Sequence, residues 1–380
     1  MFIEHESIPW SKPWLNNLES DSVSKIFETN WLSMGPCVKE FESKMATLVG
    51  SKFAVATNNG TSALEIALRA KNVGAGDTVV VPSFTYFATV SAVVRTGATP
   101  LFVDAGHDSF NLCPIDLATK ISSNTKAVVY IDYGGFPANY VDIKNIAHAA
   151  GATVIHDAAQ SLGTTRNGKS IVSEGDISTT SFHAAKLITT IEGGMIFCDD
   201  KELHEKIKRI RNQGEEYGQK YIHQDFGLNA RMTDIQAAIG LVQLIKMGSI
   251  LERRQELAEN YTRMLNGFID IKTHSSGYLD SDLAWMLYPI LIKGRDKVAA
   301  DLSAVGIDTR IAYPIPTYQQ PCVSSKYPDL DSNCPRTEQI CSQVLNLPMF
   351  HDMTELQQRR ITDEIKKSVE KWHSFNEGEK

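Results

Sequence analysis

The middle of the chain alternates short, β-branched apolar runs with stretches in which apolar residues recur every three or four positions. From Lys52 to Asp199 this alternation predicts βαβ units and a mainly parallel sheet. The predicted strands are Phe53–Ala56, Thr78–Val81, Pro100–Val103, Ala127–Ile131, Thr153–Ile155, Thr179–Phe182 and Gly194–Cys198. The predicted helices between them are Ser62–Ala70, Phe87–Arg95 and Val141–Ala150. We therefore expect one doubly wound α/β unit with a seven-stranded sheet.

A long helical pattern from Thr233 to Leu265 follows this unit, and we expect it to connect two domains. Beyond it, Ala284–Ile292 has the pattern of a strand, whereas Val298–Val305 and Arg359–Trp372 have that of helices. These patterns predict a large domain, residues 1–245, followed by a smaller C-terminal α+β domain, residues 246–380.

Composition narrows the class of protein. The 380 residues are 42% hydrophobic and 22% charged, which suits a globular chain with a large core. The net charge is −7, and the basic residues do not gather into a patch, so we expect no nucleic-acid partner. The six cysteines form no C-x-x-C pair and do not combine with histidines at zinc-ligand spacing, so we expect no metal site.

The chain also gives no sign of a membrane span, because no run of about 18 apolar residues occurs in it. Its first residues include Glu4, His5 and Glu6, where a signal peptide would have a basic start and an apolar run. We therefore expect a cytoplasmic protein.

In an open parallel sheet, ligands bind beyond the carboxyl ends of the strands. The residues just after each predicted strand are therefore the candidates for a binding or catalytic site. Gly60, Thr61 and Ser62 follow the first strand and begin a helical pattern. Amide groups and hydroxyls at a helix N-terminus suit a phosphate, although the same residue types are common helix caps.

Three further positions carry polar or aromatic groups at strand ends. Asp157 needs a cation if it is buried, and a metal, a helix N-terminus, a structural ion pair or a protonated pyridine ring would each serve. Lys186 stands among small and apolar residues, where desolvation would lower its pKa and make it a nucleophile; most lysines are simply solvated. Tyr86 can stack on a flat heterocycle or pack in a core. A phosphate site, a stacking ring, an aspartate and a buried lysine together indicate a pyridoxal phosphate (PLP) site.

The chain resembles the DegT/DnrJ/EryC1/StrS family of sugar aminotransferases. This family belongs to the aspartate aminotransferase superfamily, whose members have fold type I. The resemblance extends from about Ile8 to about Val369. Its most specific segments are Trp31–Pro36, Asn59–Leu64, Gly97–Asp104, Ser181–Gly194 and Asn229–Gly240. It implies a PLP-dependent transferase with a large domain and a smaller C-terminal domain.

The resemblance also implies roles for single residues. Lys186 would hold PLP covalently and later move a proton, and Asp157 would pair with the nitrogen of the pyridine ring. The other residues expected to bind the cofactor are Gly60, Thr61, Ser62, Tyr86, Gln160, Ser181, His183 and, from the second subunit of a homodimer, Asn229. The family's dehydratase branch has histidine in place of the lysine, so Lys186 favours transamination.

The implied reaction transfers an amino group from L-glutamate to a keto-deoxyhexose carried on a nucleoside diphosphate, by a ping-pong mechanism between PLP and its amino form. Two alternatives stay open: a transaminase of a free cyclitol or free keto-sugar, and a non-catalytic PLP-binding regulator. Candidate substrate-binding residues are Lys220, Arg231 and Tyr313. Instead of binding substrate, Lys220 would be a solvated surface lysine, and Arg231 would form a structural salt bridge; these alternatives stay open.

Some positions depart from the family's common pattern. Asp132–Gly135 stands where many members have a histidine-containing sequence, Ile191 stands where glycine is common, and Tyr318 stands where histidine is frequent. These departures leave the cofactor interpretation intact, but they leave open which keto-sugar the site accepts.

Overall fold

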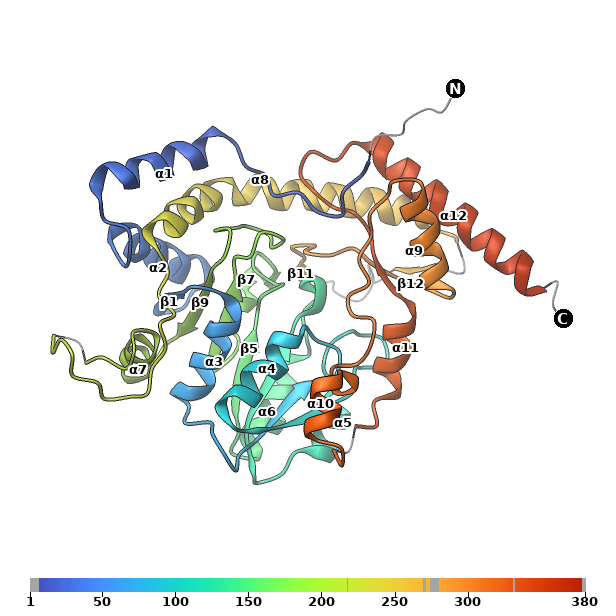
Figure 1. Ribbon diagram of the computed structural model, residues 1–380. Coiled ribbons are helices and arrows are strands. Elements are labelled where there is room, and N and C mark those ends of the chain that lie inside the picture. The colour runs from blue at the N-terminus through green and yellow to red at the C-terminus, as the bar shows by residue number, and fades with distance from the viewer. Residues whose placement is uncertain (1–6, 217, 269–270, 274–279, 331, 378–380) are drawn as a thin grey trace.

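A seven-stranded sheet forms the centre of the large unit, with the strand order β1-β9-β8-β5-β4-β2-β3 (Figure 1). β9 runs antiparallel to both of its neighbours, and the other pairs are parallel. All seven predicted strands are therefore confirmed, with small changes of bounds. The strands are β1 (Phe53–Thr57), β2 (Thr78–Pro82), β3 (Thr99–Val103), β4 (Thr125–Ile131), β5 (Thr153–Asp157), β8 (Ile177–Ser181) and β9 (Gly194–Cys198).

The computed structural model describes residues 7–377, except 217, 269–270, 274–279 and 331. The expectation of a cytoplasmic protein rests in part on Glu4, His5 and Glu6. These three residues lie outside the described residues.

Helices cover both faces of the sheet. Successive residues of a strand point to opposite sides, so a strand with consecutive apolar residues has apolar side chains to bury on each face. In β2, Val79 and Val81 pack on the side of α3, α4 and α7, whereas Val80 packs on the side of α5 and α6. α2 and α8 cover the same side as α5 and α6, at the other end of the sheet. The helices are α2 (Pro36–Val49), α3 (Gly60–Ala70), α4 (Phe87–Thr96), α5 (Pro114–Lys120), α6 (Tyr140–Ala149), α7 (Lys201–Arg211) and α8 (Asp234–Leu265).

The long helix α8 connects the two units, as Figure 1 shows in yellow. It begins with a capping box between Thr233 and Gln236 and continues without a break through Gly248 and Ser249. Within the described part of the chain, α8 is the helix whose length and hydropathy would suit a membrane span. However, it packs against α1 (Asn17–Thr29), α2 and α12 (Glu355–Glu377), which accounts for its apolar residues.

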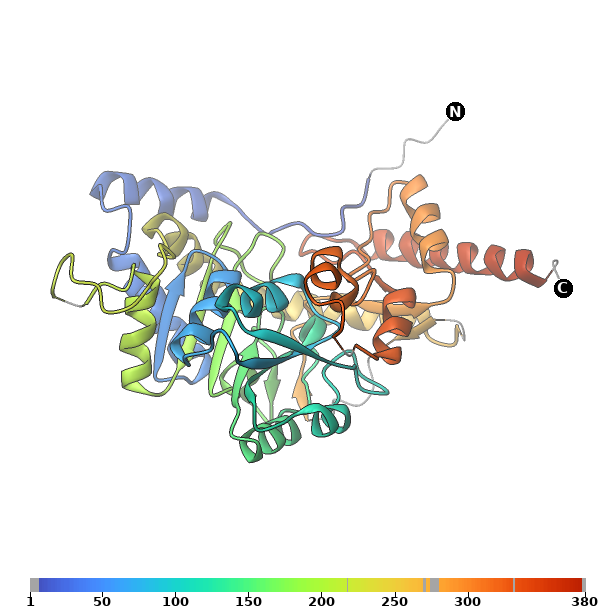
Figure 2. The ribbon, with the colours of Figure 1, turned by 60° about the horizontal axis from the view of Figure 1, so that its bottom comes forward.

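The smaller unit lies beside the large one (Figure 2) and has its own core. Its antiparallel sheet has the order β10-β12-β13, and α9 and α12 pack against each other. Ile8, near the N-terminus, is fully buried in this core and pairs with Ile307. The elements of this unit are β10 (Ile271–Thr273), β12 (Pro289–Ile292), β13 (Val344–Asn346) and α9 (Arg295–Ala304). α10 (Pro321–Lys326) and α11 (Pro335–Gln343) also follow α8, but Val323 of α10 packs into the core of the large unit. The short elements of the chain are β6 (Thr165–Arg166), β7 (Lys169–Ser170), β11 (Ser281–Asp282), η1 (Tyr133–Gly135), η2 (Ile171–Ser173) and η3 (Thr317–Gln319).

The predicted strand Ala284–Ile292 is wrong in its first half, because the sheet begins only at Pro289. The preceding residues bond to loops of the large unit instead: Ala284 N donates to Thr164 Oγ1, and Leu287 N donates to Gly134 O. Ala284, Met286 and Leu287 are buried with residues of the large unit, whereas Trp285 and Tyr288 are buried in the core of the small unit. An apolar pattern cannot distinguish such burial from burial in a sheet.

Candidate active site

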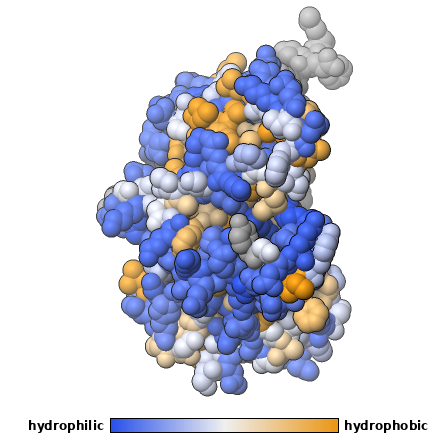
Figure 3. Space-filling model, turned by 90° about the vertical axis from the view of Figure 1, so that its left-hand side faces the viewer, coloured by the Kyte–Doolittle hydropathy of each residue, from blue (hydrophilic) through white to orange (hydrophobic). Residues whose placement is uncertain are grey.

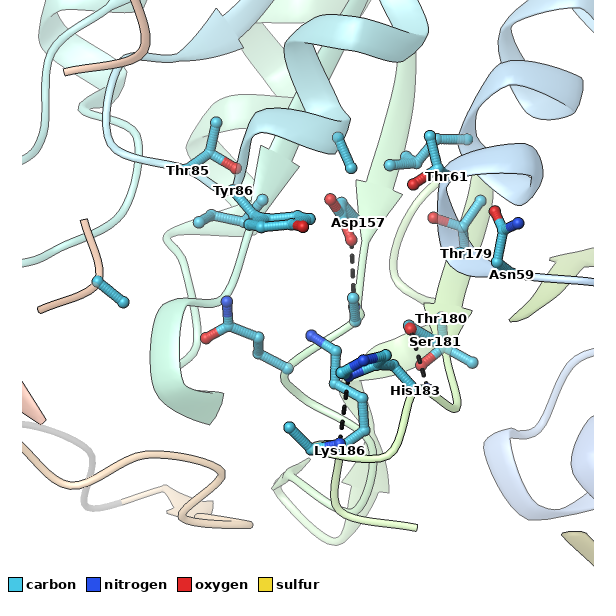
Figure 4. A pocket seen from close by; sticks show the side chains of 18 of the residues that line it. Asn59, Thr61, Thr85, Tyr86, Asp157, Thr179, Thr180, Ser181, His183 and Lys186 are labelled. Carbon is cyan, nitrogen blue, oxygen red and sulfur yellow. Dashed lines mark hydrogen bonds between the residues drawn. The ribbon is translucent and has the colours of Figure 1, made fainter. Parts of the chain in front are cut away.

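The carboxyl ends of β4, β5 and β8 border a cavity of about 760 Å³. This volume is within the range of roughly 300–1,000 Å³ that is typical of ligand sites. The cavity brings together residues that are far apart in the sequence (Figure 4). The predicted residues that line it are Gly60, Thr61, Ser62, Tyr86, Asp157, Gln160, Ser181, His183, Lys186 and Tyr313.

One end of the cavity is the N-terminus of α3. Asn59 caps this helix, with its Oδ1 accepting a hydrogen bond from Ser62 N at 2.8 Å. At Gly60, an added Cβ would lie 2.9 Å from Ser181 Cβ, so only glycine permits this close approach. At Gly194 on β9, a Cβ would come within 2.5 Å of the Asn59 carbonyl. The first-turn amides of a helix lack intrahelical acceptors, so this narrow cradle suits a phosphate.

Asp157 ends β5, and its carboxylate is buried. Oδ2 accepts from Thr89 Oγ1 at 2.9 Å, and Oδ1 accepts from Ala159 N at 3.2 Å. Burial raises the pKa of Asp157, and the Thr89 hydrogen bond and the charge of Lys186 oppose this effect. Because both hydrogen-bond donors are neutral, the carboxylate is well placed to receive a cationic N–H from a ligand in the cavity.

Lys186 follows β8 and extends into the same space as Asp157 and the ring of Tyr86 (Figure 4). Burial lowers the pKa of Lys186, and the negative charge of Asp157 partly offsets this effect. A lowered pKa increases the fraction of neutral amine, which is the nucleophilic form.

Gln160 and Tyr313 connect the two units at the cavity wall. Gln160 Nε2 donates to the hydroxyl of Tyr313 at 3.1 Å, and Gln160 Oε1 accepts from Gly134 N at 2.7 Å. The Tyr313 ring lies 6.2 Å from that of Tyr86. His183 is more exposed, and its Nε2 lies 3.7 Å from Glu192 Oε1.

The structure does not place the remaining predicted residues in this cavity. Asn229 and Lys220 are exposed, and neither they nor Arg231 line the cavity formed by the described residues of this chain. Arg231 Nη1 donates to Asn212 Oδ1 at 2.7 Å, and its backbone bridges to Thr57 in β1. The expected role of Asn229 at a second subunit stays a prediction.

Sequence reasoning missed three residues at this site. Trp10 and Arg310 line the cavity, and the guanidinium carbon of Arg310 lies 5.5 Å from the ring centre of Trp10. Thr89 holds Asp157 from within α4. Only the position of Thr89, three residues after Tyr86, gave a signal in the sequence, because that spacing places both residues at the first turn of one helix.

These residues fit PLP. The glycine-lined cradle suits its phosphate, Asp157 suits its ring nitrogen, and the amine of Lys186, with its lowered pKa, suits a bond to its aldehyde carbon. Within the described residues, no cluster of histidine, cysteine, aspartate or glutamate suits a metal ion.

Comparison with known proteins agrees with this geometry. Residues 14–366 match the DegT/DnrJ/EryC1/StrS aminotransferase family. GDP-perosamine synthase of Escherichia coli O157:H7 is 33% identical over 94% of this chain and 97% of its own length. GDP-perosamine synthase of Caulobacter vibrioides is 36% identical over 92% of this chain and 95% of its own length.

A solved structure of Spr1654 from Streptococcus pneumoniae, in the pyridoxamine phosphate (PMP) form, superposes with a TM-score of 0.92 at 26% identity. The superposition covers 98% of this chain and all of that one. The fold type I prediction is therefore confirmed. With a family match over nearly its whole length, the chain belongs to the DegT/DnrJ/EryC1/StrS aminotransferase family and is a PLP-dependent sugar aminotransferase.

Proposed function

We propose that this enzyme transfers an amino group from L-glutamate to a keto-deoxyhexose linked to a nucleoside diphosphate. The transfer has two half-reactions: the first, with glutamate, ends with the cofactor as PMP, and the second, with the keto-sugar, ends with the cofactor as PLP. The observation that carries the proposal is the pairing of Lys186 and Asp157 in one cavity. One is an amine with a lowered pKa, and the other is a buried carboxylate without a charged hydrogen-bond donor.

When bound, PLP supplies an electron-accepting ring and the carbon atom that carries the amino group. The chain's own residues bind and orient it. The amides of Gly60 and Thr61 and the hydroxyl of Ser181 would hold the phosphate, and Tyr86 would stack on the ring. Asp157 would hold a proton at the ring nitrogen, which would keep the ring a strong electron acceptor.

Lys186 is the acid and base of both half-reactions. Its Nζ would accept the proton from the α-carbon of glutamate and would hold it for delivery to the cofactor carbon that receives the amino group. In the second half-reaction it would move a proton in the opposite sense. The lowered pKa of Lys186 suits this work because a base acts best when its pKa lies near the working pH.

The names of the relatives and the size of the cavity support the proposed acceptor. Both GDP-perosamine synthases are named for amino sugars carried on a nucleotide. The cavity reaches beyond the cofactor residues to Trp10, Met286 and Arg310, which leaves room for a sugar. Lys220 and Arg231, supplied by a second subunit, are the proposed partners of the diphosphate.

The proposed active unit is a homodimer with shared sites. The loop between α7 and α8 carries Phe226, which is 99% exposed, and Tyr221, which is 75% exposed. Trp31 and Ile191 are also exposed apolar residues. Figure 3 shows the side of the molecule that carries α1 and this loop, and hydrophobic residues stand there among hydrophilic ones. A second copy that covers such residues would bring Asn229 to the neighbouring cradle.

The test compares amino transfer from L-glutamate to a 4-keto-6-deoxyhexose on a nucleoside diphosphate with transfer to the same sugar without the nucleotide and to a free inosose. The proposal predicts kcat/KM at least about a hundredfold higher for the nucleotide-linked sugar, which is worth about 2.7 kcal/mol of recognition. Preference for a free acceptor would establish the cyclitol or free-sugar alternative. No amino transfer to any acceptor would favour a non-catalytic regulator.

A further inference from the structure

The short turn η1, Tyr133–Gly135, lies at the junction of the two units. It follows β4 directly, and all three of its residues are buried. It also lies within Asp132–Gly135, one of the positions named above at which the chain departs from the family's common pattern.

Tyr133 connects this turn to the small unit. Its hydroxyl donates a hydrogen bond to Ala312 O at 2.5 Å and accepts one from Asn346 Nδ2 at 3.0 Å. Asn346 is fully buried, and its Nδ2 also donates to Arg310 O at 3.1 Å. Backbone hydrogen bonds join Arg310 and Asn346 in both directions, at 2.8 and 3.1 Å.

The two glycines of the turn contact other parts of the same cavity wall. Gly134 N donates to Gln160 Oε1, and Gln160 Nε2 donates in turn to the Tyr313 hydroxyl. Gly134 O accepts from Leu287 N at 3.3 Å. At Gly135, φ is +93°, and an added Cβ would lie 3.2 Å from Gln160 O, so the chain can make this turn only with glycine or with strain.

These contacts converge on one wall of the cavity. Arg310, Ile311, Ala312 and Tyr313 line it consecutively, together with Met286 and Leu287. All of these residues belong to the part of the chain beyond α8, whereas the cradle, Tyr86, Asp157 and Lys186 belong to the large unit. The small unit therefore supplies the wall that the cofactor residues leave for the substrate.

We propose that Tyr133 is a positioning residue for sugar recognition: through Ala312 and Asn346 it fixes the 310–313 segment that forms the substrate side of the cavity. This inference rests on the proposed function for the identity of the substrate. Burial raises the pKa of the Tyr133 hydroxyl well above its usual value, so it stays a proton donor throughout the working pH range.

The test uses the full-length holoenzyme with Tyr133→Phe, which removes only the hydroxyl. The matched control is Tyr261→Phe. Tyr261 is likewise fully buried, and its hydroxyl donates to a backbone carbonyl of the small unit, Pro348 O at 2.8 Å, but it does not line the cavity. Each variant loses a buried hydroxyl that has two hydrogen-bond partners, Ala312 O and Asn346 Nδ2 for Tyr133 and Pro348 O and Met353 Sδ for Tyr261. A general loss of stability would therefore affect both variants.

We expect Tyr133→Phe to raise KM for the nucleotide-linked keto-sugar on the order of tenfold, because displacement of a positioning wall weakens substrate alignment. The dissociation constant of PLP should change by less than about twofold, since the cradle is untouched. Tyr261→Phe should leave both constants near those of the wild type. Equal KM values in the two variants would overturn the proposal.

A second measurement does not depend on activity. Hydrogen–deuterium exchange on the protein without cofactor should show faster exchange of the 310–313 amides in Tyr133→Phe than in Tyr261→Phe. Unchanged exchange in this segment would contradict the positioning role even if the enzyme used another sugar. Failure of the wild type to aminate any sugar nucleotide would overturn the proposed function but leave the exchange result interpretable.

Discussion

Thr89 Oγ1 donates a hydrogen bond to Asp157 Oδ2 at 2.9 Å, and both groups are buried. Thr89 lies in the first turn of α4, whose N-cap is Tyr86. The start of one helix therefore supplies both an aromatic ring that lines the cavity and the hydroxyl that orients the Asp157 carboxylate. In the proposed function, this carboxylate would receive the ring nitrogen of PLP.

Thr89→Val should weaken this arrangement without changing its shape. Burial already raises the pKa of Asp157, and the Thr89 hydrogen bond lowers it, so the variant should raise that pKa further. A hydrogen bond to a charged group is worth about 1.5–3 kcal/mol, which corresponds to roughly ten- to a hundredfold in rate. Single-turnover kinetics with glutamate measure this loss. Thr89→Ser, which keeps the hydroxyl, is the control, and equal rates for the two variants would contradict the assignment.

Asp157→Asn should slow the glutamate half-reaction more strongly. The amide keeps the shape of the side chain but cannot hold the proton on the ring nitrogen. Loss of about 4 kcal/mol of transition-state stabilisation would mean on the order of a thousandfold in rate. PLP should still bind, because Lys186 and the phosphate cradle are unchanged. A rate within about threefold of the wild type would show that Asp157 serves only to hold the start of the following turn.

Shared active sites can be tested with mixed dimers. Lys186→Ala and Asn229→Ala should each be inactive alone, because one lacks the nucleophile and the other lacks the proposed phosphate contact from the second subunit. A mixed dimer contains one site with both lesions and one site with neither, so mixing should restore activity. No recovery in dimers shown to be mixed would contradict shared sites.

A buried ion pair between α1 and α8 gives a prediction on stability. Lys246 Nζ lies 2.6 Å from Glu19 Oε1, and both side chains are nearly inaccessible. Burial alone would raise the pKa of Glu19, but hydrogen bonds from Lys246, Asn16 N and Gln243 outweigh it and lower the pKa. Glu19→Gln should therefore cost about 3–5 kcal/mol at neutral pH, because it leaves Lys246 buried without its partner.

The pH dependence of this loss follows from the sign of the shift. A carboxylate with a lowered pKa in the folded state contributes stability that is fully present above its unfolded pKa, about 4.3, and is lost as pH falls through the folded value. The difference in unfolding temperature between wild type and Glu19→Gln should thus shrink below about pH 4. Glu40→Gln, which breaks the exposed pair with Lys44, is the control and should have little effect at any pH. A constant difference down to pH 3 would contradict the account.

The sequence predicts the parts of the fold that depend on local pattern. The strands of the large sheet are runs of apolar or β-branched residues that are mostly buried on both faces, so their positions can be recognised without knowledge of their partners. The site residues that follow these strands are predictable for the same reason, because parallel strands end at one edge. Lys186 and Asp157 are examples.

Features that depend on contact between distant segments could not be predicted in this way. Trp10 and Arg310 reach the cavity because the N-terminal segment pairs with the small unit at Ile8 and Ile307. The apolar stretch before Pro289 has the pattern of a strand, but its residue Leu287 bonds to Gly134 of η1 instead of to a neighbouring strand. Neither arrangement leaves a periodic signal in the sequence.

The central claim is that Lys186 and Asp157 serve transamination between glutamate and a nucleotide-linked keto-sugar. The most direct measurement follows the visible absorbance of the PLP-loaded enzyme in two steps. Addition of L-glutamate alone should abolish the absorbance of the Lys186-bound cofactor, and subsequent addition of a 4-keto-6-deoxyhexose on a nucleoside diphosphate should restore it, with one amino sugar formed per site. An absorbance that does not change with glutamate, or that returns without formation of an amino sugar, would contradict the claim.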